Sequence, residues 1–185
     1  MSLAPTPTIT LEQLLASEDR GCFEIVNGQL QEVNVSNYST SVAAELFLIL
    51  GVYCRDNRLG RLFGSDGYYR CFGLNGANAR KPDISFISAA RLPVGWREEG
   101  FFTIPPDLAV EILSPNDIAY EVNQKTKEYL EGGVKLVWII DPSIREVMIF
   151  RLDGSTQRLR ENDRLSGEDV LPGFSCLLSD FLLFP

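Results

Sequence analysis

Near the centre of the chain lies a strongly apolar run, Asp107-Leu108-Ala109-Val110-Glu111-Ile112-Leu113, followed by Ser114-Pro115-Asn116-Asp117. Near-continuous apolar residues over this length predict a strand that is central in a sheet. The segment after it can end the strand and cap a helix from about Ile118 to Glu131, where two glycines follow. A second buried strand is predicted over Leu136–Asp141. The stretch therefore predicts a strand-helix-strand unit, which prefers a right-handed crossover.

Upstream of this unit, the pattern predicts one long helix and several strands. Apolar residues at helical spacing predict the helix over about Ser39–Asn57. Strands are expected near Arg61–Ser65, Gly67–Phe72 and Asp83–Ser88, with a polar loop over Leu74–Arg80. The middle of the chain thus runs helix, three strands, helix, strand. This order predicts an α/β or α+β fold with a mixed central sheet flanked by helices.

The two ends of the chain add smaller elements. Thr8 or Thr10 can cap a short helix over Leu11–Leu15, and Asn27-Gly28 favours a two-residue turn between strands 22–26 and 29–35. The C-terminal part reads as antiparallel strands over Arg145–Leu152, Gln157–Arg160 and a segment ending at Phe174, then a helical turn over Leu177–Leu183.

The bulk composition is that of one globular domain spanning residues 1–185, with 1–7 expected to be disordered. No apolar run approaches the ~20 residues of a membrane span, and the N-terminus has no signal-peptide pattern, so we expect a cytoplasmic protein. The net charge of −8, from 25 acidic and 17 basic residues, argues against a protein that coats nucleic acid. A nuclease is still compatible with it, because a local basic groove can coexist with an acidic remainder.

The chain contains no histidine, which excludes a Ser-His-Asp triad, a Cys-His dyad and zinc bound through histidine. Any metal site must therefore use oxygen ligands, which suits Mg²⁺ or Mn²⁺. The four cysteines lie far apart among mostly apolar neighbours and are expected to be buried free thiols: Cys22, Cys54, Cys71 and Cys176.

Two acidic residues stand where a hard cation could bind. Asp83 begins a predicted strand after Pro82, and Glu111 lies within the next long strand. If these strands are neighbours, both carboxylates share one end of the sheet. Two carboxylates that close repel each other unless a cation or a proton lies between them. A metal ion there could polarise a phosphate and lower the pKa of a bound water, and a lysine could stabilise the developing charge.

The ordered set of residues resembles a family of small bacterial restriction-endonuclease-like proteins with the PD-(D/E)XK nuclease fold. The resemblance extends from Leu11 to Phe181 and includes the opening segment 23–28. The residues that carry it are Pro82-Asp83, Glu111-x-Leu113-Ser114-Pro115, Lys125, Tyr129, Gly133-Val134 and Trp138-x-x-Asp141-Pro142. No single motif is very specific, but the ordered set is.

The resemblance implies that Asp83 and Glu111 are metal ligands in an active site completed by Lys125. The usual lysine position, two residues after the glutamate, holds Leu113, so Lys125 on the following helix would replace it. A further acid from the N-terminal part would be Glu24 or Glu45, in that order. The family often has a histidine at the start of the first long helix, and here Ser39 or its neighbours stand in its place.

Each of these residues also has a purely structural interpretation. Asp83 could end a turn, and Lys125 could form a surface pair with Glu121, as Lys127 could with Glu131. Glu24 could pair across its hairpin, and Glu45 could be a solvated helix residue. The remaining polar and aromatic candidates are expected to be core residues (Tyr129, Trp138), a strand-end cap (Asp141) and a scattered basic face (Arg55, Arg58, Arg61, Arg70).

Three functions are compatible with the sequence. The first is a Mg²⁺-dependent endonuclease that hydrolyses DNA and works as a homodimer, since a two-fold protein matches a two-fold duplex. The second is a catalytically silent binding or assembly module with the same fold. The third is a hydrolase of another phosphate ester, for which no Gly-rich phosphate loop is present.

Overall fold

The computed structural model describes residues 9–18, 23–97 and 100–182. The expectations for residues 1–7, Thr8, Cys22 and Leu183 lie outside this part of the chain. Within it, no helix combines the length and the apolar character needed to cross a membrane.

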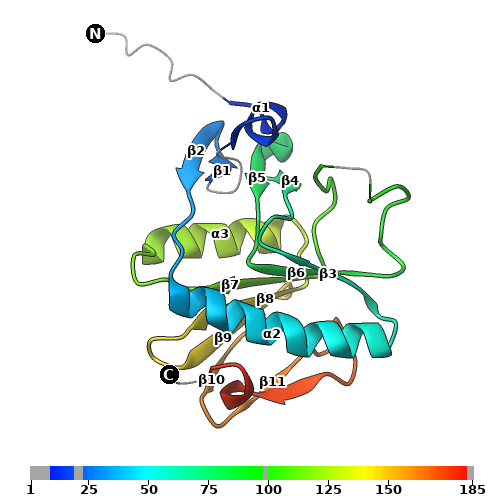
Figure 1. Cartoon of the computed structure of the whole chain (residues 1–185), viewed down its shortest axis with the longest axis vertical. Helices are drawn as coiled ribbons and strands as arrows, with labels where there is room; N and C mark the ends of the chain where they lie inside the picture. The colour runs from blue at the N-terminus through cyan, green and yellow to red at the C-terminus, as the bar shows by residue number, and fades with distance from the viewer. Residues whose placement is uncertain (1–8, 19–22, 98–99, 183–185) are drawn as a thin grey trace.

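A six-stranded mixed sheet forms the centre of the molecule (Figure 1). Its order is β10-β9-β8-β7-β6-β3, and only β7 and β8 run parallel. The strands are β3 (Gly60–Gly64), β6 (Ile84–Ser88), β7 (Leu108–Ile112), β8 (Leu136–Asp141), β9 (Glu146–Arg151) and β10 (Thr156–Arg160). The predicted mixed sheet and the strand-helix-strand unit are therefore confirmed.

Helices α2 (Asn37–Asp56) and α3 (Ala119–Glu131) cover opposite faces of this sheet (Figure 1). Residues Leu108 and Val110 of β7 pack in the core on the α2 face, whereas Ala109 packs in the core on the α3 face. Successive side chains of a strand point to opposite faces, so this alternation also assigns Glu111 to the α3 face.

A second, smaller sheet carries the N-terminal part of the chain. Its order is β2-β1-β5-β4, and the short helix α1 (Leu11–Leu15) packs beside it, with Thr10 forming a capping box. The strands are β1 (Phe23–Val26), β2 (Gln29–Glu32), β4 (Tyr69–Phe72) and β5 (Asn78–Arg80). The turn between β1 and β2 has positive φ at both Asn27 and Gly28, as predicted.

The prediction of a polar loop over Leu74–Arg80 was wrong. This segment contains the 3₁₀ turn η2 (Leu74–Gly76) and strand β5, which pairs with β1 through Ile25 and Ala79. A three-residue strand is too short to show a periodicity, and its partner lies about fifty positions earlier in the chain. Its presence matters for the site, because Arg80 ends this strand.

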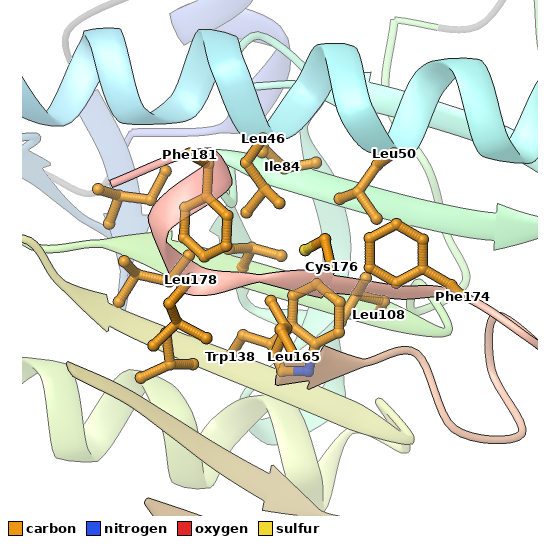
Figure 2. Close-up of a cluster of buried hydrophobic side chains, with 14 of the residues drawn as sticks. Leu46, Leu50, Ile84, Leu108, Trp138, Leu165, Phe174, Cys176, Leu178 and Phe181 are labelled. Atoms are coloured by element: carbon orange, nitrogen blue, oxygen red, sulfur yellow. The ribbon is translucent and has the colours of Figure 1, made fainter. Parts of the chain in front are cut away.

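The C-terminal segments close the α2 face of the sheet. Figure 2 shows Phe174, Leu178 and Phe181 packing with Leu46 of α2 and Trp138 of β8. The strand expected to end at Phe174 was misplaced, because the pairing strands are β11 (Arg164–Ser166) and β12 (Ser175–Leu177), and η3 (Leu178–Asp180) follows. Gly173, at φ +81, turns the chain so that Phe174 enters the core before β12 begins.

The cysteines within the described ranges are free, as predicted: Cys54 and Cys176 are buried and Cys71 is partly buried. Burial raises the pKa of the Cys54 thiol to about 11, so it stays protonated and packs as a small apolar group.

Asp107, at the start of β7, gives the fold a measurable acid sensitivity. Its carboxylate lies 2.8 Å from both Arg91 Nη1 and Lys135 Nζ and accepts a hydrogen bond from the Ser88 amide. Burial acts to raise its pKa, but these three donors outweigh burial and hold the pKa below its usual value.

A carboxylate whose pKa is lowered on folding adds stability above its unfolded pKa, and this stability is lost as the pH falls through the folded pKa. We therefore expect Asp107→Asn to destabilise the protein at neutral pH and to flatten the loss of stability below about pH 4. Urea unfolding from pH 3 to pH 7 measures both effects. Parallel pH profiles for wild type and variant would contradict this assignment.

Candidate active site

Asp83 and Glu111 lie at one end of the neighbouring antiparallel strands β6 and β7. Ile84 pairs with Val110, so Asp83, one residue before β6, stands beside Glu111 in the register. Asp83 Oδ2 accepts a hydrogen bond of 2.7 Å from the Ile112 amide, which fixes this carboxylate against β7. The condition on which the predicted pair depended, that the two strands are neighbours, is therefore met.

Lys125 reaches this pair from α3. Its Nζ lies 2.9 Å from Glu111 Oε2 and 2.9 Å from Glu24 Oε1, and its side chain is only 15% exposed. The alternative surface pair with Glu121 is not the arrangement found. Lys127, two residues further and about 200° around the helix, forms the expected exposed pair with Glu131 at 3.7 Å.

Of the two candidate N-terminal acids, the structure brings Glu24 to the site. Glu24 is buried on β1, and its Oε1 accepts a 2.8 Å hydrogen bond from the Lys81 amide. Glu45 lies on α2, on the opposite face of the sheet, and does not line the pocket around Asp83. Glu24 therefore lines the pocket and Glu45 does not, and a role of Glu24 as a further metal ligand stays a prediction.

Tyr129, expected only as a core aromatic, has a second contact. It is fully buried, and its hydroxyl donates a 2.6 Å hydrogen bond to Glu111 Oε1. Four residues separate Lys125 from Tyr129, so both project from the same side of α3 onto the two oxygens of Glu111. Glu111 is thus held by one hydrogen bond at each carboxylate oxygen.

Arg80 is a site residue that the sequence did not indicate, as are Glu128, its partner, and Asp117 in the pocket lining. Its guanidinium is 5% exposed and lies 3.0 Å from Glu24 Oε2 and 2.7 Å from Glu128 Oε2. Arg80 therefore links Glu24 of β1 to Glu128 of α3, next to Lys125. An arginine one residue before Lys81-Pro82-Asp83 was the only available signal, and it does not reveal a partner on a distant strand.

The pKa values of these groups differ according to their surroundings. Burial raises the pKa of Glu111 to about 7, because Asp83 and Glu24 add to the effect and Lys125 only partly offsets it. Burial likewise raises the pKa of Asp83. Burial also acts on Glu24, but Lys125 and Arg80 outweigh it and lower the pKa. Burial opposes the charge of Lys125, but Glu111 and Glu24 overcome it and raise the pKa, so the amine remains protonated.

The charged side chains connected to Asp83 and Glu111 carry an excess of negative charge, which a divalent cation could compensate. With every group ionised, four connected carboxylates (Glu24, Asp83, Glu111, Glu128) face two cations (Arg80, Lys125), a formal balance of −2. Burial, together with this excess negative charge, raises the pKa values of Asp83 and Glu111. Mg²⁺ is commonly held by one or two carboxylates together with water and substrate oxygens. Across residues 9–18, 23–97 and 100–182, no group of three or more acidic, cysteine or histidine side chains could enclose a metal. Asp83 and Glu111 are the two carboxylates of this pocket that could hold such an ion, with water and substrate oxygens completing its coordination.

We call the small hollow around these residues the carboxylate pocket. It has a volume of about 70 Å³ and is lined by Glu24, Arg80, Asp83, Glu111, Asp117 and Lys125, among others. The basic residues considered for a groove are not in its lining: Arg55 pairs with Asp56, and Arg70 with Glu12. Trp138 is a core residue and Asp141 caps the turn through the Ser143 amide, as expected.

Ser39, at the position where the family often has histidine, has a structural contact. It is buried in the first turn of α2, and its Oγ lies 3.0 Å from Ser114 Oγ in the segment after β7. This bond joins the start of α2 to the loop that leads into α3.

Comparison with known proteins places the fold and the family. A crystal structure described as "a putative nuclease belonging to DUF820", from Anabaena variabilis ATCC 29413, superposes with a TM-score of 0.81. The match covers 94% of this chain and 97% of that one at 22% sequence identity, and it shows a shared nuclease-like fold. No curated protein matches the sequence. The sequence pattern of one family, described as "Putative restriction endonuclease", matches residues 10–179, and the chain therefore belongs to this family, Uma2.

Proposed function

We propose that the protein is a divalent-metal-dependent endodeoxyribonuclease that hydrolyses phosphodiester bonds at the carboxylate pocket. The observation that carries this proposal is that Asp83, just before β6, Glu111 of β7 and Lys125 of α3 converge on one small hollow. Asp83 and Glu111 would hold Mg²⁺ or Mn²⁺. When bound, the ion would act as a Lewis acid toward the phosphodiester and lower the pKa of the attacking water.

The protein's own residues would place and stabilise charge. Lys125 is protonated and fixed by two carboxylates, so it can stabilise negative charge that develops on the phosphoryl oxygens without moving. Its raised pKa makes it unsuited to act as a general base. Tyr129 orients Glu111, and Arg80 orients Glu24 behind the lysine.

The direct test is an incubation of the purified protein with supercoiled, linear and single-stranded DNA, with Mg²⁺, with Mn²⁺ or with EDTA. We expect cleavage products only in the presence of a divalent ion. Absence of cleavage on every DNA with either ion would overturn the proposed activity.

Under this proposal the working form is a homodimer in the cytoplasm. Light scattering would measure the mass of the protein in solution and so test the dimer.

Lys125→Met gives a sharper test, with Lys127→Met as its control on the same helix. We expect Lys125→Met to slow cleavage by roughly 100-fold or more, because one preorganised charge toward the transition state is lost. Lys127 is 66% exposed, and its replacement should leave the rate within about twofold because a surface pair contributes little. Equal rates for the two variants would remove Lys125 from the site.

A catalytically silent binding module is the second candidate. It is favoured by one observation, that Lys125 already bridges Glu24 and Glu111 and neutralises part of their charge. In that case the acids would serve folding, and the protein would take up no divalent ion at millimolar concentration. Metal binding therefore separates the two candidates before any substrate is known.

A further inference from the structure

A second, larger hollow adjoins the carboxylate pocket. We call it the side cavity; its volume is about 600 Å³, within the range of small-molecule sites. Leu113, Asp117 and Val122 line both hollows, so the two meet at the first turns of α3. Lys125 faces the carboxylate pocket, whereas Asn123 and Thr126 face the side cavity.

The side cavity has an apolar floor and a polar rim. The floor consists of Ile139 of β8 and Met148 and Phe150 of β9, on the part of the sheet beside α3. Asn123 and Asp141 stand among the polar lining groups. An amide both donates and accepts hydrogen bonds, whereas a carboxylate accepts only. Such a lining fits a flat group with apolar faces and a polar edge.

The charge of the lining excludes a phosphate as the occupant. Asp117 and Asp141 line the side cavity, and no lysine or arginine of the described residues does so. An anion would meet like charge without compensation. The group that enters must therefore be neutral or positively charged, and not an anion.

We infer that the side cavity receives an unpaired nucleobase of the strand whose phosphodiester lies in the carboxylate pocket. This inference rests on the proposed function and extends it to a substrate class: single-stranded or locally unpaired nucleic acid. A base is joined to its phosphate through one sugar, so a single nucleotide can fill two hollows that share a wall. Two aromatic residues, Tyr38 and Phe150, belong to the lining, and aromatic side chains are the usual stacking partners of unpaired bases.

The net charge supports the same substrate class. A duplex carries a denser row of phosphates than a single strand, and proteins that grip it neutralise several of them with basic side chains. A chain with net charge −8 and an acidic cavity wall is poorly suited to that contact. Stacking of one base on an aromatic ring contributes about 1–3 kcal/mol, and this contribution does not itself depend on a basic surface.

Two variants narrow the side cavity, each with a matched control outside its lining. Met148→Trp fills the floor, and its control is Ile144→Trp, a 60% exposed position in the turn before β9. Asn123→Trp blocks the rim from an exposed site on α3, with Gln124→Trp on the next residue as its control. The rim variant keeps the test valid if the floor variant unfolds.

The probe is a short single-stranded DNA carrying 2-aminopurine at successive positions, compared with strands that carry one abasic site and with a duplex. Binding is followed by anisotropy and 2-aminopurine fluorescence, in EDTA and in Ca²⁺. We expect a fluorescence change at one position, tighter binding of the single strand than of the duplex, and at least about tenfold weaker binding by Asn123→Trp and Met148→Trp. An abasic site at that position should remove the difference between these variants and their controls.

Three results would overturn the inference: no binding in either buffer, equal binding by the cavity variants and their controls, or a duplex bound more tightly than the single strand. These outcomes are separate from the proposed activity, because binding is measured without turnover. Divalent-dependent cleavage combined with any of them would retain the nuclease and remove the nucleobase site. Base-dependent binding without cleavage would retain the nucleobase site and remove the nuclease.

Discussion

Glu111→Gln is expected to abolish divalent-dependent DNA cleavage, lowering the rate by more than about 100-fold. Even residues that only orient a metal ligand typically contribute 10–100-fold, and Glu111 is assigned as a ligand itself. Glutamine keeps the shape of the side chain and can still accept the hydrogen bond from Tyr129, but it carries no charge to hold a cation. Lys125 retains its contact with Glu24, so the fold should persist.

The matched control is Glu131→Gln, on the exposed end of α3, where the side chain pairs weakly with Lys127 at 3.7 Å. Its cleavage rate should equal that of the wild type. Rates are measured on one DNA substrate in Mg²⁺, and circular dichroism checks that both variants are folded. Cleavage by Glu111→Gln at the wild-type rate would show that the reaction occurs elsewhere or comes from a contaminant.

Arg80→Ala is expected to lower the free energy of unfolding by about 3–5 kcal/mol, which is the usual cost of removing one partner from a buried ion pair. Arg80 compensates Glu24 and Glu128 at once; its loss would leave Glu24 with Lys125 alone and Glu128 with no ion pair among the described residues. For a chain of this length, the melting temperature should fall by roughly 6–20 °C. Arg80→Lys should be intermediate, because an ammonium cannot reproduce the planar fork of the guanidinium.

Arg70→Ala is the control for this prediction. Arg70 is 40% exposed and pairs with Glu12, so its removal should cost less than about 1 kcal/mol. Urea unfolding of the three variants beside the wild type measures the difference. Equal stabilities for Arg80→Ala and Arg70→Ala would show that the buried network contributes little to the fold.

The sequence revealed the parts of the fold that have a local signal. The apolar run over 107–113, the helix after it and the strand over 136–141 each show length or periodicity in the chain itself, and all three are present. Glu111 stood out for the same reason, because a carboxylate within an apolar strand requires a partner. The structure supplies Lys125 and Tyr129 as those partners.

The parts that were missed depend on contacts between distant segments. Arg80 acquires its role only when β5 pairs with β1, and a three-residue strand leaves no periodic signal. Phe174 was expected at the end of a strand, but it enters the core one residue before β12. The side cavity is likewise invisible in the sequence, because it is bounded by two helices and two strands that meet only in the fold.

The most direct test of the central claim is a calorimetric titration of Mn²⁺ and Mg²⁺ into the wild type and into Asp83→Asn, without DNA. Asp83 and Glu111 are assigned as the ligands, and the formal balance of −2 on their network, with every group ionised, favours a divalent ion. We predict saturable uptake of a divalent ion by the wild type, weakened by at least about tenfold in Asp83→Asn. The account is contradicted if the wild type takes up no ion at millimolar concentration, or if Asp83→Asn binds it equally well.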